Sequence, residues 1–530
     1  MFFQCFCKHS SILGSALSDM KTSWIALPIT VALTSTMMAQ AEALYRINGI
    51  PGPQVSSQPL VKELENELSA LRRQVEARSK AANLAQALEA GLLNNPLLAA
   101  AYAEIQGQQW SAIAKRRQWY PTISVGSGSN LPRLNLPSQN FSDTSIVESY
   151  PAVDVVKRSS VSTRNSAGNL GLTLSWTFFD PSRGAAINSA EDSLKRQRLL
   201  FDVSARNLAL EIQLAYFNLQ KQKQLIKSYD EILQFTGRQV RIAEVQFNNG
   251  LISIADVEQV RTQQFATITT LIDAYREFID ASSRLAETMA LPPGNLVLPS
   301  DDLSAEGRWD ESLEKTIEQA LRLREEIQAS LAAAESASWS ATSLFNTYWP
   351  RFSLGASTQY DYNYSNITSS TQGEVTTFNR RNRLWNGGVG IGFTWQLFDG
   401  GINAAQGEIQ KAIARQARDQ AAQNRLSVTK EVEQSFSAYQ TGLRGLLSTE
   451  AQAKSARAAA VAVQKRFQVG VDDMSSLVVA LNQAIRAAND YASAIRNYNS
   501  SVAGLYRSSA RWPSGTRLLL ETRINTLRQR

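Results

Sequence analysis

Residues 170–180 read Leu170-Gly-Leu-Thr-Leu-Ser-Trp-Thr-Phe-Phe-Asp180, and residues 389–399 read Val389-Gly-Ile-Gly-Phe-Thr-Trp-Gln-Leu-Phe-Asp399. In both stretches large apolar side chains alternate with small or polar ones, as in a β-strand, where successive side chains point to opposite faces. One apolar face and one small, polar face are typical of a transmembrane barrel with lipid outside and water inside. An amphipathic sheet on a soluble core would give the same alternation. The predicted lipid-facing residues are Leu170, Leu172, Leu174, Trp176, Phe178, Val389, Ile391, Phe393, Trp395 and Leu397.

The two stretches belong to an internal repeat with an offset of about 220 residues. Upstream, Trp119-Tyr-Pro-Thr-Ile-Ser-Val125 matches Tyr348-Trp-Pro-Arg-Phe-Ser-Leu354. Downstream, Phe247-Asn-Asn-Gly-Leu251 matches Phe467-Gln-Val-Gly-Val471. Because three matches occur in the same order, we interpret the chain as a duplicated, domain-sized unit.

Two partner strands and two loops complete the predicted sheet. The partner strands are residues 122–130 and 351–362. The polar segments 131–167 and 364–384 are predicted to be long loops on the extracellular side. Since four strands cannot close a barrel, this sheet predicts oligomerisation.

A long helix is predicted to follow each second strand. Asp180 can cap the first of them with Pro181 at the first helical position, and no proline follows before Phe247. At 1.5 Å per residue this helix would extend for roughly 100 Å. Apolar residues recur every seven positions, which indicates a seam against neighbouring helices. The seam residues are Ala205, Ile212, Leu219, Ile226, Leu233, Val240 and Phe247 in the first half, and Val432, Tyr439, Leu446, Ala453, Ala460 and Phe467 in the second.

The pattern resumes after each turn, so each half predicts a helical hairpin. The return seams are Val257, Leu271, Phe278 and Leu285, and Leu477, Tyr491, Tyr498 and Leu505. A further heptad segment at residues 60–78 is predicted to be a small coiled coil or a partner-binding arm. The stretch from Arg511 to Arg530 shows no obvious structural pattern.

The N-terminus has the features of a secretory signal. Lys21 precedes an apolar run at residues 24–38, and small residues then permit cleavage after Ala41 or Ala43. No later stretch reaches about 18 uninterrupted apolar residues, so we expect any membrane-embedded part to be a β-barrel.

The start of translation stays open between Met1 and Met20. The two cysteines, Cys5 and Cys7, and the single histidine, His9, all precede the expected cleavage site. Without them the chain lacks the commonest metal ligands and the commonest general base. We therefore predict that the protein is not an enzyme and has no cofactor and no metal site.

The formal net charge is +7, and basic and acidic residues are mixed along the chain. Short basic clusters occur at residues 115–117 and at Arg380, Arg381 and Arg383. A nucleic-acid-binding protein would need a larger clustered basic face. We interpret these clusters as solvated or interfacial surfaces and expect no nucleic-acid partner.

The order of a helix, two strands and a long helical hairpin, duplicated once behind a signal peptide, resembles the TolC-like outer-membrane factors. The segments Phe247-Asn-Asn-Gly-Leu-Ile-Ser-Ile-Ala-Asp-Val257 and Phe467-Gln-Val-Gly-Val471 are similar to the hairpin turns of that family. The resemblance covers residues 83–505. It implies an α+β membrane protein, a homotrimer whose twelve-stranded β-barrel, four strands per protomer, continues into a long α-helical barrel.

The resemblance also implies that the two turns form a periplasmic tip, which docks an adaptor protein and constricts to close the channel. Glycine suits both turns because it adopts positive φ between antiparallel helices. The implied docking residues are Asn249, Gly250, Leu251, Val469, Gly470 and Val471. The candidate gate residues are Phe247, Asp256, Phe467, Asp472 and Asp473. Rings of such aspartates would favour cations, but acids at helix N-termini are equally well explained by the helix dipole.

These observations predict a division of the chain into ten segments. They are an N-terminal extension and signal peptide (1–43), an extension with a short coiled coil (44–82), the helix of repeat 1 (83–118), a strand pair with extracellular loop 1 (119–181), helical hairpin 1 with its tip (182–290), an equatorial connector (291–312), the helix of repeat 2 (313–348), a strand pair with loop 2 (349–399), helical hairpin 2 with its tip (400–505) and a C-terminal equatorial tail (506–530).

The predicted function is a passive exit duct in the cell outer membrane, with a tunnel extending into the periplasm, for a tripartite efflux or type I secretion system. Its expected partners are a periplasmic adaptor (membrane fusion protein), an inner-membrane RND or ABC transporter, and outer-membrane lipid. The alternative is a periplasmic coiled-coil adaptor or structural protein of an envelope complex, although the duplicated two-faced strands argue against it. Neither the transported substrate nor the class of pump can be predicted.

Overall fold

The computed structural model describes residues 58–126, 138–150 and 155–529. The chain divides into two units, residues 1–70 and 71–530. In the first unit the described residues 58–70 are helical, and the second unit holds both sheets and all the later helices. The predicted signal peptide lies outside the described residues, as do residues 127–130 of the first predicted partner strand.

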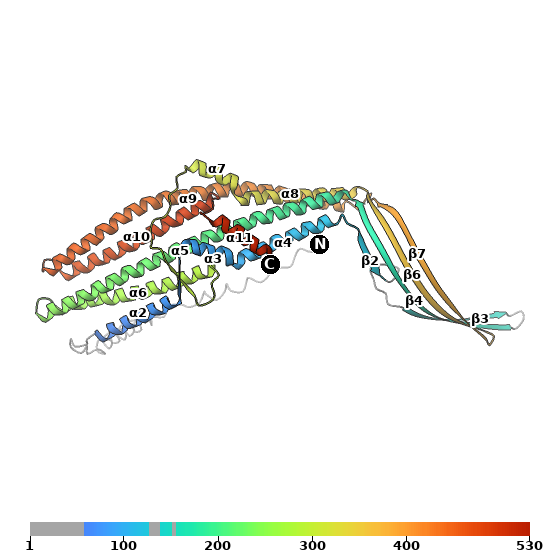
Figure 1. Ribbon diagram of the computed structural model, residues 1–530, viewed down its shortest axis with the longest axis horizontal. Helices are drawn as coiled ribbons and strands as arrows, with labels where there is room; N and C mark the ends of the chain where they lie inside the picture. Colours follow the sequence, from blue (N-terminus) through green and yellow to red (C-terminus); the bar gives the residue numbers. More distant parts are fainter. Residues whose placement is uncertain (1–57, 127–137, 151–154, 530) are drawn as a thin grey trace, which may run out of the picture. The chain divides into compact units, whose positions relative to one another are not determined.

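Helices and strands alternate in the order of the predicted repeat (Figure 1). The elements are α2 (Gln58–Arg78), β1 (Ser79–Ala82), α3 (Leu84–Asn94), α4 (Pro96–Arg117), β2 (Thr122–Gly126), β3 (Ser138–Tyr150), β4 (Val155–Phe179), α5 (Pro181–Asn248), α6 (Ile254–Thr288), β5 (Leu296–Pro299), α7 (Leu313–Leu323), α8 (Glu325–Phe345), η1 (Asn346–Tyr348), β6 (Arg351–Thr371), β7 (Glu374–Thr394), α9 (Ile402–Gln468), α10 (Met474–Ser508) and α11 (Thr516–Gln529).

The two longest helices, α5 and α9, have 68 and 67 residues. Asp180 caps α5 by accepting a hydrogen bond from the Ser182 amide, and Pro181 occupies the first turn, which confirms the predicted start. The heptad seam is buried where it was predicted at Ile212, Leu219 and Val432, each with no exposed surface. Because α5 contacts α4, α6, α8 and α10, while α9 contacts α8 and α10, the helices form one continuous layer.

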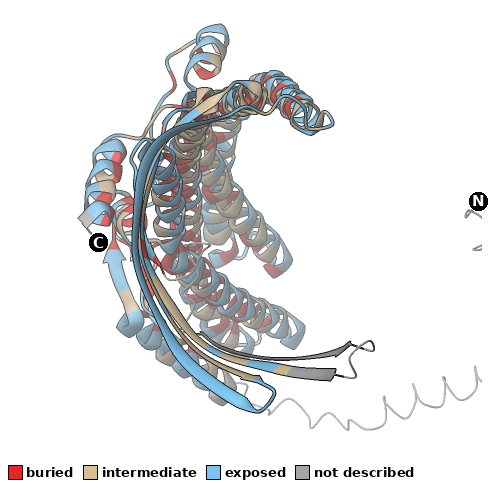
Figure 2. Ribbon diagram, turned by 90° about the vertical axis from the view of Figure 1, so that its right-hand side faces the viewer, coloured by how far each residue is buried: buried red, intermediate tan, exposed pale blue. Residues whose placement is uncertain are grey.

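The main sheet is antiparallel and has the strand order β2-β4-β6-β7, with β3 also paired to β4. β2 pairs with residues 171–175 of β4 and β3 with residues 155–167, so four strands lie side by side at either level. Figure 2 shows this sheet as a curved layer whose residues are mostly exposed or half-buried, whereas the helices carry buried stripes. The core therefore lies among the helices, and the sheet has no hydrophobic core of its own within the described residues.

The two predicted loops are wrong over most of their length. β6 and β7 pair without interruption as far as Thr371 and Glu374, and the turn between them is Gln372-Gly373, with φ of +52° and +88°. Two residues with positive φ are the usual tight hairpin turn, because their twist matches that of the strands. β3 and β4 fill most of residues 138–167 in the same way. Polar residues can form strands when both faces of a hairpin contact water, so polarity alone did not indicate a loop.

Three further elements differ from the expectation. The first helical stretch of each repeat is broken once, at Asn95 and at Arg324, where ψ is 127° and 121°. The C-terminal stretch, in which the sequence shows no obvious structural pattern, forms α11, and Leu520 and Leu527 bury its apolar side in the main core. The apolar residues of this short helix show only a weak helical spacing, and arginines lie between them, so the sequence did not predict the helix.

A small parallel sheet joins the N-terminal extension to the connector. β1 pairs with β5 from Ser79–Leu296 to Ala82–Pro299. Next to it the Arg78 guanidinium donates to the Gly294 carbonyl over 3.0 Å. Four-residue strands carry almost no periodicity, so the sequence pattern could not reveal this pairing.

Buried ion pairs hold the helix break of the second repeat. Arg324 is 2 % exposed and its guanidinium donates to Glu326 (3.0 Å), Glu431 (2.7 Å) and the Ser508 carbonyl (3.2 Å). Arg507 also donates to Glu326, over 2.6 Å. Burial raises the pKa of the Glu326 carboxyl, but Arg507 and Arg324 outweigh it and leave that pKa below its usual value.

Arg324→Met should lower the free energy of unfolding by about 1–2 kcal/mol, because Glu431 and the Ser508 carbonyl lose their buried donor while Glu326 keeps Arg507. Arg322→Met, on the exposed last turn of α7, is the matched control and should change little. Guanidinium unfolding of both variants in detergent, followed by the helical circular dichroism signal, measures the difference. Equal midpoints for the two variants would contradict the role given to Arg324.

Asp202, near the same break, makes the fold sensitive to pH. Burial, and then the neighbouring Glu325 carboxylate, raise the pKa of Asp202 from 3.8 to about 6, against the opposing effect of Arg206 and Arg517. A carboxyl with a raised pKa supports folding fully below its usual pKa, and this support is lost as the pH rises through about 6.

Asp202→Asn should therefore raise the thermal midpoint at about pH 8 and leave it nearly unchanged at about pH 4, each relative to the unmodified protein at the same pH. Asp419→Asn, at an exposed position of α9, is the control for the loss of one charge. A gain that is the same at both pH values would show that the charge of Asp202 is not its cause.

Candidate functional site

The strand residues predicted to face lipid lie on one face of the sheet, which we call the outer face. Directly paired residues of neighbouring strands lie on the same face, and Leu172, Thr358 and Gly387 form one such row. The next rows toward the helices are Leu174, Ala356 and Val389, then Trp176, Leu354 and Ile391. Nine of the ten predicted lipid-facing residues are exposed, and Leu174 is half-buried. β7 ends at Thr394, so Trp395 and Leu397 lie just beyond the strand in which they were predicted.

Aromatic side chains lie at both ends of this apolar face. At the helix end, Phe352 contacts Phe178, Phe179 and Phe393 with ring centroids 5.8–6.4 Å apart. Each is a strand residue next to the junction with the helices. Aromatic rings of this kind collect where a membrane surface meets water.

The second aromatic row was missed by the sequence interpretation. Tyr360 and Trp385 are direct cross-strand partners, with ring centroids 6.0 Å apart. Both are exposed. Trp385 lies one residue past the end of the segment interpreted as a loop, and residues 375–385 show no regular alternation that could have found the row.

A repeated hydrogen bond fixes the junction between sheet and helices. The Trp176 indole donates to the Trp119 carbonyl over 2.8 Å, and the Trp395 indole donates to the Tyr348 carbonyl over 2.9 Å. In both copies the acceptor lies in the Trp-Tyr-Pro or Tyr-Trp-Pro segment that precedes the first strand. The repeated segments at Trp119 and Tyr348 thus accept the hydrogen bonds that orient each strand pair relative to its helices.

The inner face of the sheet is lined mostly by polar and small residues, although Phe378 and Leu384 also lie on it. Gly171, Gly355, Gly390 and Gly392 lie on it. Asp361 accepts hydrogen bonds there from the side-chain amides of Gln359 (2.6 Å) and Asn386 (3.1 Å). Small and hydrogen-bonded polar residues suit a surface that contacts water.

The two helical turns have the same geometry. Gly250 and Gly470 have φ of +71° and +77°. In each turn the amide after the glycine reaches back to a helix carbonyl over 2.9 Å, from Leu251 to Gln246 and from Val471 to Arg466. This six-to-one bond is the Schellman motif, which requires a left-handed residue and so favours glycine. The remaining predicted docking residues, Asn249, Leu251, Val469 and Val471, are exposed around these turns.

The helix that follows each turn is capped by the same pair of residue types in exchanged positions. In the first repeat Ser253 is the N-cap of α6, and the Asp256 carboxylate accepts from its amide (2.9 Å) and hydroxyl (2.7 Å). In the second repeat Asp473 is the N-cap of α10 and accepts from the Ser476 amide over 2.9 Å. Hydrogen bonds from the Ser476 side chain and backbone lower the pKa of Asp473.

The five candidate gate residues are not gathered on one surface. Phe467 is buried with Val240, Val257 and Met474 in a cluster that joins the two hairpins near their turns, whereas Phe247 is 37 % exposed. Asp472 is held by Arg466, whose guanidinium lies 2.7 Å away. Each aspartate thus has a local partner that stabilises the turn.

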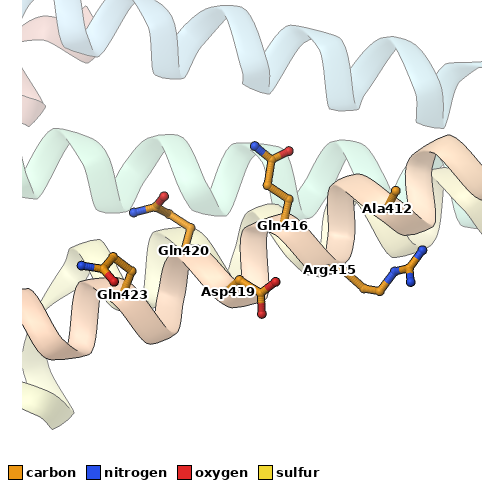
Figure 3. A pocket seen from close by; sticks show the side chains of 6 residues that line it. All are labelled: Ala412, Arg415, Gln416, Asp419, Gln420 and Gln423. Atoms are coloured by element: carbon orange, nitrogen blue, oxygen red, sulfur yellow. The ribbon is translucent and has the colours of Figure 1, made fainter.

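A polar groove of about 650 Å³ follows one face of α9 (Figure 3). Its lining side chains are Ala412, Arg415, Gln416, Asp419, Gln420 and Gln423, which recur along the surface of the helix. The described residues contain no cluster of His, Cys, Asp and Glu suited to a metal ion. None of the described helices is long and apolar enough to cross a membrane.

Known proteins resemble this chain in sequence and in fold. Residues 87–290 and 316–511 match the family "Outer membrane efflux protein". The chain is 22 % identical to the outer membrane protein TolC of Escherichia coli (strain K12), over 79 % of this chain and 80 % of the relative. It is 21 % identical to TolC of Vibrio cholerae, over 78 % of this chain and 92 % of the relative. The structure of the Campylobacter jejuni CmeC outer membrane channel superposes with a TM-score of 0.63 at 14 % identity, over 83 % of this chain and 89 % of that one.

The family match covers most of the chain and spans both copies of the repeat, including both turns. It does not favour the alternative of a periplasmic adaptor or structural protein. Its members are channel proteins and not enzymes. The chain belongs to the outer membrane efflux protein family, and it is an exit duct of the outer membrane whose helices extend into the periplasm.

Proposed function

We propose that three copies of this chain close into one passive duct, with a twelve-stranded β-barrel continuing into an α-helical barrel. The unpaired edges of the sheet carry this proposal. β7 pairs only with β6, and β2 pairs only with β4, within the described residues. In lipid, unpaired strand edges leave backbone groups without hydrogen bonds, which costs several kcal/mol for each group.

The directions of the edge strands suit closure by copies of the same chain. β2 runs away from the helices and β7 runs back toward them, so β7 of one copy can pair antiparallel with β2 of the next. The helical layer is also open at its sides. Exposed apolar residues lie on its edge helices, among them Trp110 of α4 and Leu426 and Leu447 of α9. Burying such residues against a neighbouring copy would add to the free energy of assembly.

The two turns support docking of a periplasmic adaptor at the tip. Leu251, Val469 and Val471 expose apolar side chains on turns whose backbone is held by hydrogen bonds. Rigid, exposed apolar residues are the kind of contact that anchors an interface. With an adaptor and an inner-membrane RND or ABC transporter supplying the energy, the duct itself would only conduct. The aspartates at positions 256, 472 and 473 remain candidates for the constriction.

Paired cysteines on the two edges test closure. Val125→Cys on β2 combined with Ile391→Cys on β7 places one thiol near each edge of the same protein. Oxidation should yield covalent trimers in the outer-membrane fraction, and shifted pairs such as Ile123→Cys with Phe393→Cys would find the register. Each single-cysteine variant is the control and should stay monomeric in denaturing gels. If no pair along the two strands cross-links, edge-to-edge closure is wrong.

Cysteine cross-linking from Val471 in whole cells tests docking, with captured proteins identified by mass spectrometry. Capture of an adaptor belonging to a proton-driven exporter would indicate small-molecule efflux, and capture of one belonging to an ATP-driven transporter would indicate secretion of proteins or peptides. An equivalent cysteine at Ala412, on the polar groove of α9, is the control and should capture no adaptor. Several tip positions that all fail to reach an adaptor would contradict the assignment of the turns.

Gly470→Val should reduce transport while leaving the amount of assembled oligomer unchanged, because a β-branched residue is strained at a φ of +77°. Gly445→Val is the matched control, since its surroundings in α9 are open and its φ is that of a helix. The measurement is substrate export at matched levels of heat-resistant oligomer. Normal export by Gly470→Val would show that the tip geometry is not needed for docking or opening.

A further inference from the structure

The outer face of the sheet becomes basic beyond the distal aromatic row. Following the same face away from the helices, Tyr362 pairs with Arg383, and Tyr364 pairs with Arg381. The Arg381 guanidinium lies over the Tyr364 ring, 5.8 Å from its centroid, so the two side chains share that face. Arg164 of β4 pairs with Asn366 and belongs to the next row.

The two faces of the sheet carry different charge. Over residues 159–179 of β4, and over β6 and β7, the outer face holds Arg164, Arg381 and Arg383 and no acidic residue. On the inner face of the same strands, Arg351 and Arg380 are balanced by Asp361 and Glu374. A sheet that contacts water on both faces would have no reason to carry all of its excess positive charge on one of them.

The height of these arginines matches the edge of a lipid bilayer. From Phe393 to Trp385 the strand has nine residues, the length of a tilted strand that crosses the hydrocarbon core of a membrane. Arg383, Arg381 and Arg164 lie two, four and six residues farther along this face, so about 7, 13 and 20 Å along the tilted strands. Aromatic rings lie at the level of the headgroups, and the charged phosphates of lipids are found at and just outside that level.

We propose that Arg164, Arg381 and Arg383 form a basic belt that binds the phosphate groups of lipids in the outer leaflet. The proposal rests on the proposed barrel, in which this face of the sheet contacts lipid. Guanidinium groups suit this ligand because their planar fork donates two hydrogen bonds to one phosphate. The belt continues the apolar face directly, so one lipid of the outer leaflet can place its chains against the half of that face next to Trp385 and its phosphate against the arginines.

A titration of the purified oligomer in a neutral detergent tests the belt. The probe is a glucosamine-disaccharide lipid with two phosphates, compared with the same lipid without phosphates, and bound lipid is counted by native mass spectrometry. The variant is Arg164→Gln/Arg381→Gln/Arg383→Gln. Arg380→Gln removes a charge from the same strand on the opposite face and is the matched control.

The unmodified oligomer should bind the phosphorylated lipid about tenfold more tightly than the lipid without phosphates, or more. The triple variant should lose this preference and Arg380→Gln should keep it. Equal binding of both lipids, an unchanged preference in the triple variant, or equal competition by inorganic phosphate alone would each overturn the lipid assignment. If all variants still form heat-resistant oligomers, such a result leaves the proposed barrel intact; if the unmodified protein forms none, both proposals are wrong.

Discussion

The backbone hydrogen bonds at the two free edges of the sheet are the constraint on which the rest of the structure depends. In a bilayer no water can replace a missing partner, so the proposed duct pairs β2 and β7 with strands of other chains. This requirement explains why a sheet without its own core can be stable. The helical layer is open at the same two sides, since α4 leads into β2 and α9 follows β7.

The helices supply the rigidity that the sheet lacks. Their seam buries residues such as Ile212 and Leu505 completely, and the tryptophan ties at Trp176 and Trp395 transmit the orientation of the helices to the strands. The break at Arg324 sits in a network of buried ion pairs, which is costly to disrupt but adds little net stability by itself. The network instead fixes the backbone geometry of the break, where the direction of the helix changes.

Long, regular patterns were predictable from the sequence, and short or polar ones were not. The heptads, the cap at Asp180 and the alternation of residues 170–178 each repeat a physical period or match a known pairing closely enough to be recognised. The strands β1 and β5, with four residues each, do not. The distal half of β6 and β7 was missed because polarity was taken as the mark of a loop. For the candidate gate, sequence could place aspartates near the turns but not their hydrogen bonds, which depend on local backbone geometry.

The exchanged caps at Ser253–Asp256 and Asp473–Ser476 have a consequence for symmetry. Both repeats cap the helix that follows the turn with a serine and an aspartate, but the two carboxylates lie at positions three residues apart along the helix. In a ring built from three chains, the backbone at the six helix starts would be similar. The negative charges would repeat only three times, because the two hairpins of each chain carry their carboxylates at different positions. A partner that contacts only the backbone of the turns could bind every hairpin in the same way. A partner that binds through charged groups would distinguish one hairpin of each chain from the other.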